Sequence, residues 1–226
     1  MSDAYIVRRG KIIQGGGGFD PNGAILKVVT STGCTVAVTG TGYSQTQQDG
    51  DGFPRSDDAN VTEHFFSIPA SAFGTITVKS TNTYGDNTKT VSVNTAGRAY
   101  EVLCGGKNII LNSAFGLQSG YTPNSSYWTY SDRDKTLNAP RAWYVNVFTT
   151  PIPVSAYSML TITASTGADY NAKLIDSDDR ELCGLSFSGS SATVNLLTQT
   201  GSITDKYYPT ADFIFYGTLI TEIVLT

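Results

Sequence analysis

The chain is poor in the side chains on which most enzymes and metal sites depend. Its 226 residues include one histidine, three cysteines and only 15% charged residues. Cys34, Cys104 and Cys183 are far apart, and neither a CxxC pair nor a Cys/His spacing occurs. A structural zinc site or a disulfide framework needs closely repeated ligands or paired cysteines, so neither is predicted. We expect three reduced cysteines that pack as small hydrophobic residues.

Basic clusters and long apolar runs are also missing. The net charge is −4, the isoelectric point is about 4.9, and Arg8-Arg9 is the one adjacent basic pair. Binding to a phosphate backbone requires clustered lysine and arginine, so nucleic acid is not an expected partner. No run has the length of a membrane span, and residues 1–5 do not begin a secretory signal. We therefore expect no membrane partner, and a protein made in a reducing cytoplasm or assembled there into something larger.

Residues for catalysis or cofactor binding form no recognisable motif. Gly105-Gly106-Lys107 lacks the spacing of a phosphate loop, and the single histidine, His64, accompanies no nucleophile elbow. The aspartates within residues 49–58 and 176–179 depart from the calcium-loop frame and are typical of solvated turns. The sequence therefore predicts a protein that is not an enzyme and that has no metal and no cofactor.

Threonine, serine, glycine and tyrosine dominate instead, in short runs where apolar and polar residues alternate. In residues 34–38 the apolar side chains fall on one face of a strand. Residues 75–80 and 88–94 predict a hairpin with its turn at residues 85–86, because glycine tolerates the positive φ of tight turns. Such strands, separated by glycine-rich and asparagine-rich turns, predict a small immunoglobulin-like β-sandwich over residues 19–104.

A second series of strands follows Gly105-Gly106, which we take as the junction between two domains. Alternating runs recur from residue 143 onward, with no helical periodicity between them. The closing run, residues 220–225, is apolar enough to predict a core strand. The whole protein is therefore expected to be all-β, with a jelly-roll-like β-sandwich over residues 105–226.

Residues 1–18 are predicted to form an N-terminal arm and a glycine linker. The arm is too apolar for a plain disordered tail, and the tetraglycine at residues 15–18 separates it from the first domain. It either docks onto a neighbouring protein, for instance by adding a strand, or pairs with its own domain. The candidate assembly contact consists of Tyr5, Ile6, Val7, Arg8 and Arg9.

An aromatic cluster provides the candidate ligand-binding site. It lies in a segment rich in serine, threonine and asparagine, and consists of Tyr121, Tyr127, Trp128 and Tyr130. Aromatic faces beside hydroxyl and amide groups suit stacking on sugar rings and hydrogen bonding to their hydroxyls. In the alternative interpretation, Trp128 and Tyr130 are core residues at alternate positions of a strand.

Two parts of the chain resemble structural proteins of tailed-bacteriophage virions. Residues 4–10, followed by glycine and a small β-domain, resemble the N-terminus of such proteins in phages and prophages of Gram-positive gut bacteria. Residues 152–162 and 219–225 are similar to their C-terminal sandwich. These proteins are tail-fibre, baseplate or head-decoration components, and no catalytic or binding residue comes with the resemblance.

The resemblance implies a non-enzymatic virion protein that is assembled in the host cytoplasm and contacts other virion proteins. A tail-fibre or baseplate position is favoured, with host-surface glycan binding as a further role and a homotrimer as the expected oligomer. Two alternatives stay open. The first is a capsid decoration or head-fibre protein anchored by the arm, and the second is a carbohydrate-binding module of a secreted enzyme.

Overall fold

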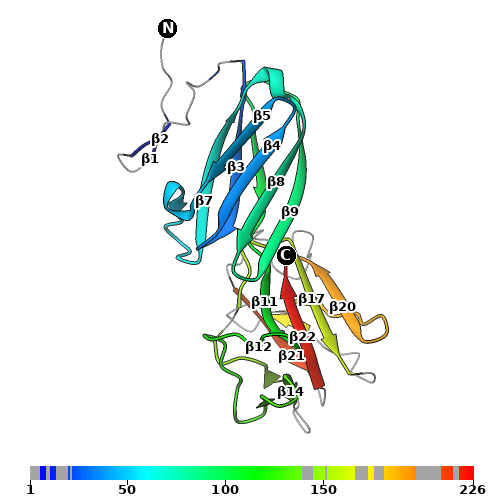
Figure 1. Cartoon of the computed structure of the whole chain (residues 1–226). Coiled ribbons are helices and arrows are strands. Elements are labelled where there is room, and N and C mark those ends of the chain that lie inside the picture. Colours follow the sequence, from blue (N-terminus) through cyan, green and yellow to red (C-terminus); the bar gives the residue numbers. More distant parts are fainter. Residues whose placement is uncertain are drawn as a thin grey trace. The chain divides into compact units, whose positions relative to one another are not determined.

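The structure is a computed structural model, and it shows an all-β protein (Figure 1). The residues that it describes are 6–8, 11–13, 20, 22–138, 145–150, 152–165, 173–175, 181–196, 210–215 and 219–226. Helical structure in these residues is confined to two 3-10 turns, η1 (Asp49–Asp51) and η2 (Ala70–Ala72), which are far too short to cross a membrane. The chain divides into two compact units, unit 1 (Met1–Lys107) and unit 2 (Asn108–Thr226).

The N-terminal arm forms a small sheet of its own. Strand β1 (Ile6–Arg8) pairs antiparallel with β2 (Lys11–Ile13), so that Ile6 lies opposite Ile13. In the described residues the arm thus pairs with itself. The sequence had suggested two other arrangements, docking onto a neighbouring protein or pairing with its own domain. Tyr5, Arg9 and the tetraglycine lie outside the described residues.

Unit 1 contains a sandwich of two four-stranded sheets. Its strands are β3 (Ala24–Ser31), β4 (Thr35–Gly40), β5 (Tyr43–Gln47), β6 (Phe53–Pro54), β7 (Val61–Ile68), β8 (Gly74–Asn82), β9 (Gly85–Val93) and β10 (Ala99–Leu103). One sheet has the order β10-β3-β7-β6 and the other β5-β4-β8-β9, and Figure 1 shows the second layer in front of β3 and β7. The predicted sandwich is confirmed. Within the sandwich, β4 pairs antiparallel with both β5 and β8, and β10 runs parallel to β3.

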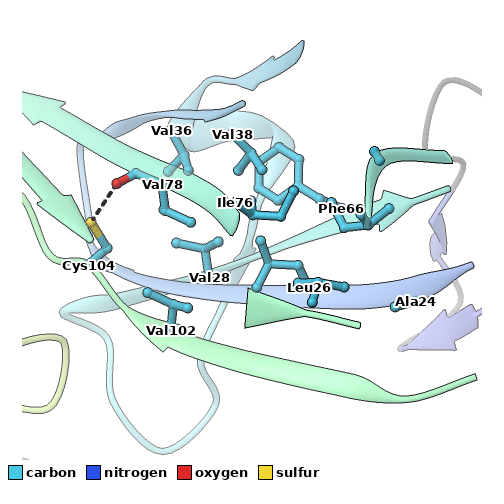
Figure 2. Close-up of a cluster of buried hydrophobic side chains, with 13 residues drawn as sticks. Ala24, Leu26, Val28, Val36, Val38, Phe66, Ile76, Val78, Val102 and Cys104 are labelled. Atoms are coloured by element: carbon cyan, nitrogen blue, oxygen red, sulfur yellow. Dashed lines mark hydrogen bonds between the residues drawn. The ribbon is translucent and has the colours of Figure 1, made fainter. Parts of the chain in front are cut away.

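The core of unit 1 follows from the period-two alternation of its strands. Leu26 and Val28 of β3 are fully buried, whereas the residue between them is half-buried on the opposite face. Figure 2 shows these two side chains opposite Ile76 and Val78 of β8. The thiol of Cys104 closes one end of the cluster, where it donates to the Val78 carbonyl oxygen (Sγ···O 3.8 Å).

The β8–β9 hairpin turns two residues earlier than the sequence predicted. Asn82 pairs with Gly85, so the turn consists of Thr83 and Tyr84, and the predicted turn at residues 85–86 is wrong. The side-chain oxygen of Asn82 accepts a hydrogen bond from the Tyr84 N–H (2.9 Å), which sets the turn. Gly85 uses its positive φ of 122° just after the turn, as the first residue of β9.

Unit 2 contains two antiparallel sheets of shorter strands. Its strands are β11 (Asn108–Asn112), β12 (Gly116–Leu117), β13 (Thr129–Ser131), β14 (Thr136–Asn138), β15 (Val145–Asn146), β16 (Ile152–Pro153), β17 (Met159–Ala164), β18 (Lys173–Ile175), β19 (Glu181–Gly184), β20 (Ser191–Asn195), β21 (Thr210–Phe215) and β22 (Leu219–Leu225). The larger sheet runs β12-β11-β22-β14-β13; β17 pairs with the other edge of β22, and β20 pairs with β17. The smaller one runs β15-β21-β18-β19, with β16 also on β21.

The closing strand β22 is the centre of the larger sheet. It pairs with β17 along one edge and with β11 and β14 along the other. Ile220, Ile223 and Leu225 are fully buried. The predicted core strand at the end of the sequence is therefore confirmed.

The two glycines that the sequence suggested as a junction are packed inside unit 1. The carbonyl of Gly105 accepts a hydrogen bond from Asn87 Nδ2 (2.8 Å). A Cβ atom on Gly106 would collide with the Asn82 side-chain amide and would lie 2.8 Å from the Cys34 sulfur, so any other residue would force these side chains to move. The division into units accordingly falls after Lys107, three residues beyond the boundary drawn from the sequence.

Candidate functional site

An aromatic residue lies at the tip of the turn between β11 and β12. Asn112 pairs with Gly116, which leaves residues 113–115 as a three-residue turn. The Asn112 Oδ1 atom accepts hydrogen bonds from the N–H groups of Ala114 (3.0 Å) and Phe115 (2.9 Å). Gly116 completes the turn with a φ of 68°, a conformation that glycine adopts readily. This arrangement leaves Phe115 57% exposed.

The β13–β14 hairpin packs against the same turn through Tyr130. The Tyr130 hydroxyl accepts a hydrogen bond from the Leu117 N–H (3.1 Å) and donates one to Asp132 Oδ1 (3.4 Å). A Cβ atom on Gly116 would collide with this hydroxyl and would lie 3.1 Å from Lys135 Cδ. The absence of a side chain at Gly116 is therefore what allows the two hairpins to fit together.

Asp132 and Lys135 place a charge pair beside these rings. Lys135 Nζ donates to Asp132 Oδ1 at 2.7 Å, and the two side chains are 34% and 84% exposed, respectively. This hydrogen bond lowers the pKa of Asp132 and raises the pKa of Lys135, so both groups are charged at neutral pH. Lys135 also has a φ of 55°, which costs about 1–2 kcal/mol for a residue with a Cβ. The loop therefore holds Lys135 in a conformation that it would rarely adopt by itself.

Tyr127 lies on a second turn, three positions before Tyr130 in the chain. The N–H groups of Tyr127 and Trp128 both donate to the Asn124 carbonyl, at 2.9 and 2.8 Å. Trp128 is only 1% exposed and anchors this turn, whereas Tyr127 is 51% exposed. Tyr127 precedes Tyr130 by three positions, so their Cα atoms lie within about 11 Å. We use the name aromatic corner for Phe115, Tyr127, Tyr130, Asp132 and Lys135.

The structure separates the four aromatic residues that the sequence grouped. Tyr127 is exposed and Tyr130 is half-buried at the corner. The half-buried ring of Tyr121 packs on Phe148 (centroids 5.7 Å apart), and its hydroxyl accepts a hydrogen bond from Asn108 Nδ2 (3.3 Å). Trp128 is a core residue, so its ring offers no face for a ligand, and the alternative interpretation applies to it.

Sequence reasoning missed three members of the aromatic corner: Phe115, Asp132 and Lys135. A signal for Phe115 was present, because an asparagine and a glycine four residues apart bracket it and both favour a tight turn. No sequence signal indicated that this turn would meet the β13–β14 hairpin, since that contact joins segments that are separate in the chain.

The remaining reactive side chains are distributed through the cores. His64 is fully buried on β7, near the core as expected; its Nδ1 atom lies 3.2 Å from Gln47 Oε1, and burial lowers its pKa. Cys34 and Cys104 are buried as predicted, which raises the pKa of both thiols, and Cys183 is half-buried. Among the described residues, no group of three or more histidine, cysteine, aspartate or glutamate side chains is arranged to hold a metal ion.

The comparisons with known proteins identify no family. No protein-family model matches the chain, and no curated protein matches it. One solved structure that matches is the Bacteroides ovatus SGBP-B of the mixed-linkage glucan utilization locus, in complex with a mixed-linkage heptasaccharide. The identity is 15% and the TM-score is 0.29, over 92% of this chain and 51% of that one. This chain thus spans about half the length of that protein, and at this TM-score the match supports no conclusion about fold or function.

Proposed function

We propose that the chain is a non-enzymatic binding and assembly protein of a tailed-phage virion, and that the aromatic corner of unit 2 binds a neutral glycan of the host surface. One observation carries the glycan part of the proposal. Two aromatic rings, those of Phe115 and Tyr127, are more than half exposed on turns whose backbones are hydrogen-bonded.

The chemistry of the corner favours a sugar over other ligands. The apolar face of a pyranose packs on an aromatic ring, while its hydroxyl groups need donors and acceptors nearby. Asp132 and Lys135 supply both, and their charges cancel, so the corner has no net attraction for a charged ligand. Because hydrogen bonds order both turns before binding, less conformational entropy is lost when the ligand arrives.

The test is a screen of the full chain on an oligosaccharide array, followed by titration with the best-bound neutral oligosaccharide. Phe115→Ala and Tyr127→Ala should each weaken binding by roughly three- to tenfold, the range expected for loss of one ring contact. Tyr121→Phe is the matched control, because it keeps the ring on Phe148 and removes only a hydroxyl outside the corner. Unchanged affinity in both alanine variants would refute the glycan site.

The virion part of the proposal is supported by the resemblance of residues 4–10, 152–162 and 219–225 and by the composition, which is rich in glycine, serine, threonine and tyrosine. Electron microscopy of purified phage particles labelled with an antibody against this chain tests it. Label at the tail tip supports a tail-fibre or baseplate component, and label on the head supports a decoration or head-fibre protein anchored by the arm. Particles without label would favour the second alternative, a carbohydrate-binding module of a secreted enzyme.

A further inference from the structure

The β13–β14 hairpin holds a lysine in a backbone conformation for which the chain otherwise uses glycine. Ser131 pairs with Thr136, so residues 132–135 form the turn, and Lys135 is the last of them. Its φ is 55°, and every other described residue with a positive φ is a glycine. Glycine adopts this conformation without the clash that a Cβ atom causes. Lysine therefore adds backbone strain that glycine would avoid.

The contacts of the Lys135 side chain do not offset this strain. Its one ion pair in the described residues joins Nζ to Asp132 Oδ1 (2.7 Å), and the Asp132 side chain is 84% exposed. An exposed pair of this kind is worth less to stability than the strain costs, because water solvates both partners and salt screens them. Strain that the fold does not repay is typical of functional sites, where it keeps a side chain in place.

The strained turn places the lysine ammonium beside the β11–β12 turn. A Cβ atom built on Gly116 would lie 3.1 Å from Lys135 Cδ and 3.6 Å from Lys135 Nζ. Gly116 directly follows Phe115, the exposed ring at the tip of that turn. The lysine stem thus lies across Gly116, and the ammonium group is next to the backbone that carries the Phe115 ring.

Both members of the charge pair have hydrogen-bonding capacity left for a ligand. An ammonium group has three N–H donors, and the described contacts of Lys135 use one of them. Lys135 Nζ and the Tyr130 hydroxyl both donate to Asp132 Oδ1, so the second carboxylate oxygen, Oδ2, keeps its capacity to accept. A donor and an acceptor side by side match two adjacent hydroxyl groups of a pyranose. One hydroxyl accepts from the ammonium while the other donates to the carboxylate.

We propose that Lys135 is the specificity-determining residue of the aromatic corner, kept in a strained conformation because its ammonium and the Asp132 carboxylate together bind two adjacent hydroxyl groups of a neutral sugar. This inference rests on the proposed glycan function and names its ligand class, a hexopyranose with a free pair of adjacent hydroxyl groups. The aromatic rings of the corner give apolar contact to any sugar ring, whereas the charge pair selects for the hydroxyl pair.

Titration of the full chain and of two Lys135 variants tests the binding role. The probes are the hexasaccharides of glucose, galactose and mannose, and the O-methylated form of the best-bound one lacks hydroxyl donors. Lys135→Gln keeps the strained backbone and removes the charge, while Lys135→Gly removes both. Each should weaken binding roughly tenfold, as expected for loss of a hydrogen bond to a charged group. The O-methylated ligand should bind the wild type at least about tenfold more weakly than the free hexasaccharide.

The melting temperatures of the same variants separate a binding role from a structural one. Lys135→Gly should melt about 2–4 °C above Lys135→Gln and no lower than the wild type, because only glycine removes the strain. A purely structural lysine predicts the reverse. Loss of its stem from Gly116 would then lower the melting temperature of Lys135→Gly below that of the wild type. Scanning calorimetry of the full chain measures all three proteins.

Two further variants control for charge. Lys135→Arg keeps the charge and the N–H donors and should bind within about threefold of the wild type. Arg133→Gln removes an exposed charge from the same turn and should change neither affinity nor melting temperature.

Unchanged affinity in Lys135→Gln, an equal loss in Arg133→Gln, or a Lys135→Gly variant that melts below the wild type would each overturn the proposal. The glycan function itself would still stand if Phe115→Ala and Tyr127→Ala weakened binding in that case. If no hexasaccharide bound the wild type at about 10 mM, both the glycan function and the role of Lys135 would be refuted.

Discussion

The two units use β-structure in different ways. Unit 1 has four strands of eight or nine residues, whereas the longest described strand of unit 2, β22, has seven. Phe115 and Tyr127, the large hydrophobic residues that stand out as exposed in the described chain, both belong to unit 2. Long strands fix the register of every side chain, while short strands end in turns, and turns present side chains to ligands. We infer that unit 1 has the more rigid frame and that unit 2 provides the more open recognition surface.

The two units also differ in where their charged groups lie. In unit 1 the carboxylate of Glu63 is buried between Lys27 and Arg55. In unit 2 the charges of the aromatic corner, Asp132 and Lys135, are at the surface. A buried carboxylate is strongly destabilising when it loses its partners, so the arrangement of Glu63, Lys27 and Arg55 is constrained by the fold. The exposed pair of Asp132 and Lys135 in unit 2 can change with little effect on stability.

The strongest test of the comparison is a cavity in the core of unit 1. Leu26→Ala should lower the free energy of unfolding by about 2–5 kcal/mol, because it removes a fully buried side chain opposite Ile76. Phe115→Ala in unit 2 should change stability by no more than about 0.5 kcal/mol, since that ring is mostly exposed. Urea unfolding followed by circular dichroism measures both. Similar losses in the two variants would show that the exposed ring is part of a core.

The second test concerns two glycines of unit 2 that share a backbone conformation and differ in their surroundings. Gly116 has a φ of 68°, and a Cβ atom added to it would collide with the Tyr130 hydroxyl. Gly120 has a φ of 97°, and a Cβ atom added to it would have no other atom within 4 Å. Gly120→Ala should cost about 1 kcal/mol, from backbone strain alone. Gly116→Ala should cost about 2–3 kcal/mol, because the collision with the Tyr130 hydroxyl adds to the same strain.

Thermal unfolding of the two alanine variants gives the comparison directly. Equal melting temperatures would mean that the contact between the β11–β12 turn and Tyr130 does not hold the corner together. A larger loss in Gly116→Ala, together with weaker glycan binding, would show that the position of Phe115 depends on this contact.

The sequence could predict the features that depend on neighbouring residues along the chain, such as the buried face of a strand. The alternation at residues 34–38 assigns the buried face of β4 correctly, because in a strand that pattern is local. The turn at Thr83-Tyr84 lies two residues before the predicted one. Asn82, which precedes the turn, sets it, and Gly85 follows it. The local signal for this turn is Asn82, whose side chain accepts the Tyr84 N–H, and Gly85 is the first residue of the next strand.

The candidate sites depend on contacts between distant segments, and these leave no periodic signal. Lys27 and Arg55 of unit 1 meet at Glu63 because β3, which contains Lys27, and β6, which Arg55 follows, both pair with β7. Tyr127 and Trp128 are adjacent aromatic residues, yet one is exposed and the other is in the core. Composition could place an aromatic cluster in this segment, but only the three-dimensional fold decides which ring faces solvent.

The smallest expected effect is a pH dependence that belongs to unit 1 alone. Burial lowers the pKa of His64 from its ordinary value of 6.5, against the opposing influence of Asp49 and Asp51, so the folded protein holds the imidazole neutral. The unfolded chain takes up a proton as the pH falls through 6.5, while the folded chain does so only at lower pH. Stability should therefore be complete above this pH and should decline below it, by at most about 1.4 kcal/mol per pH unit, until the folded pKa is reached.

His64→Gln isolates this contribution, because glutamine can still donate to Gln47 Oε1 and does not titrate. We expect the difference in unfolding free energy between wild type and variant to be constant above pH 6.5 and to shift in favour of the variant as the pH falls. Carboxylates titrate alike in both proteins, so their contribution cancels in the difference. A difference that stays constant through the acid range would mean that His64 is protonated in the folded protein as readily as in the unfolded chain, and the burial of its imidazole would then not lower its pKa.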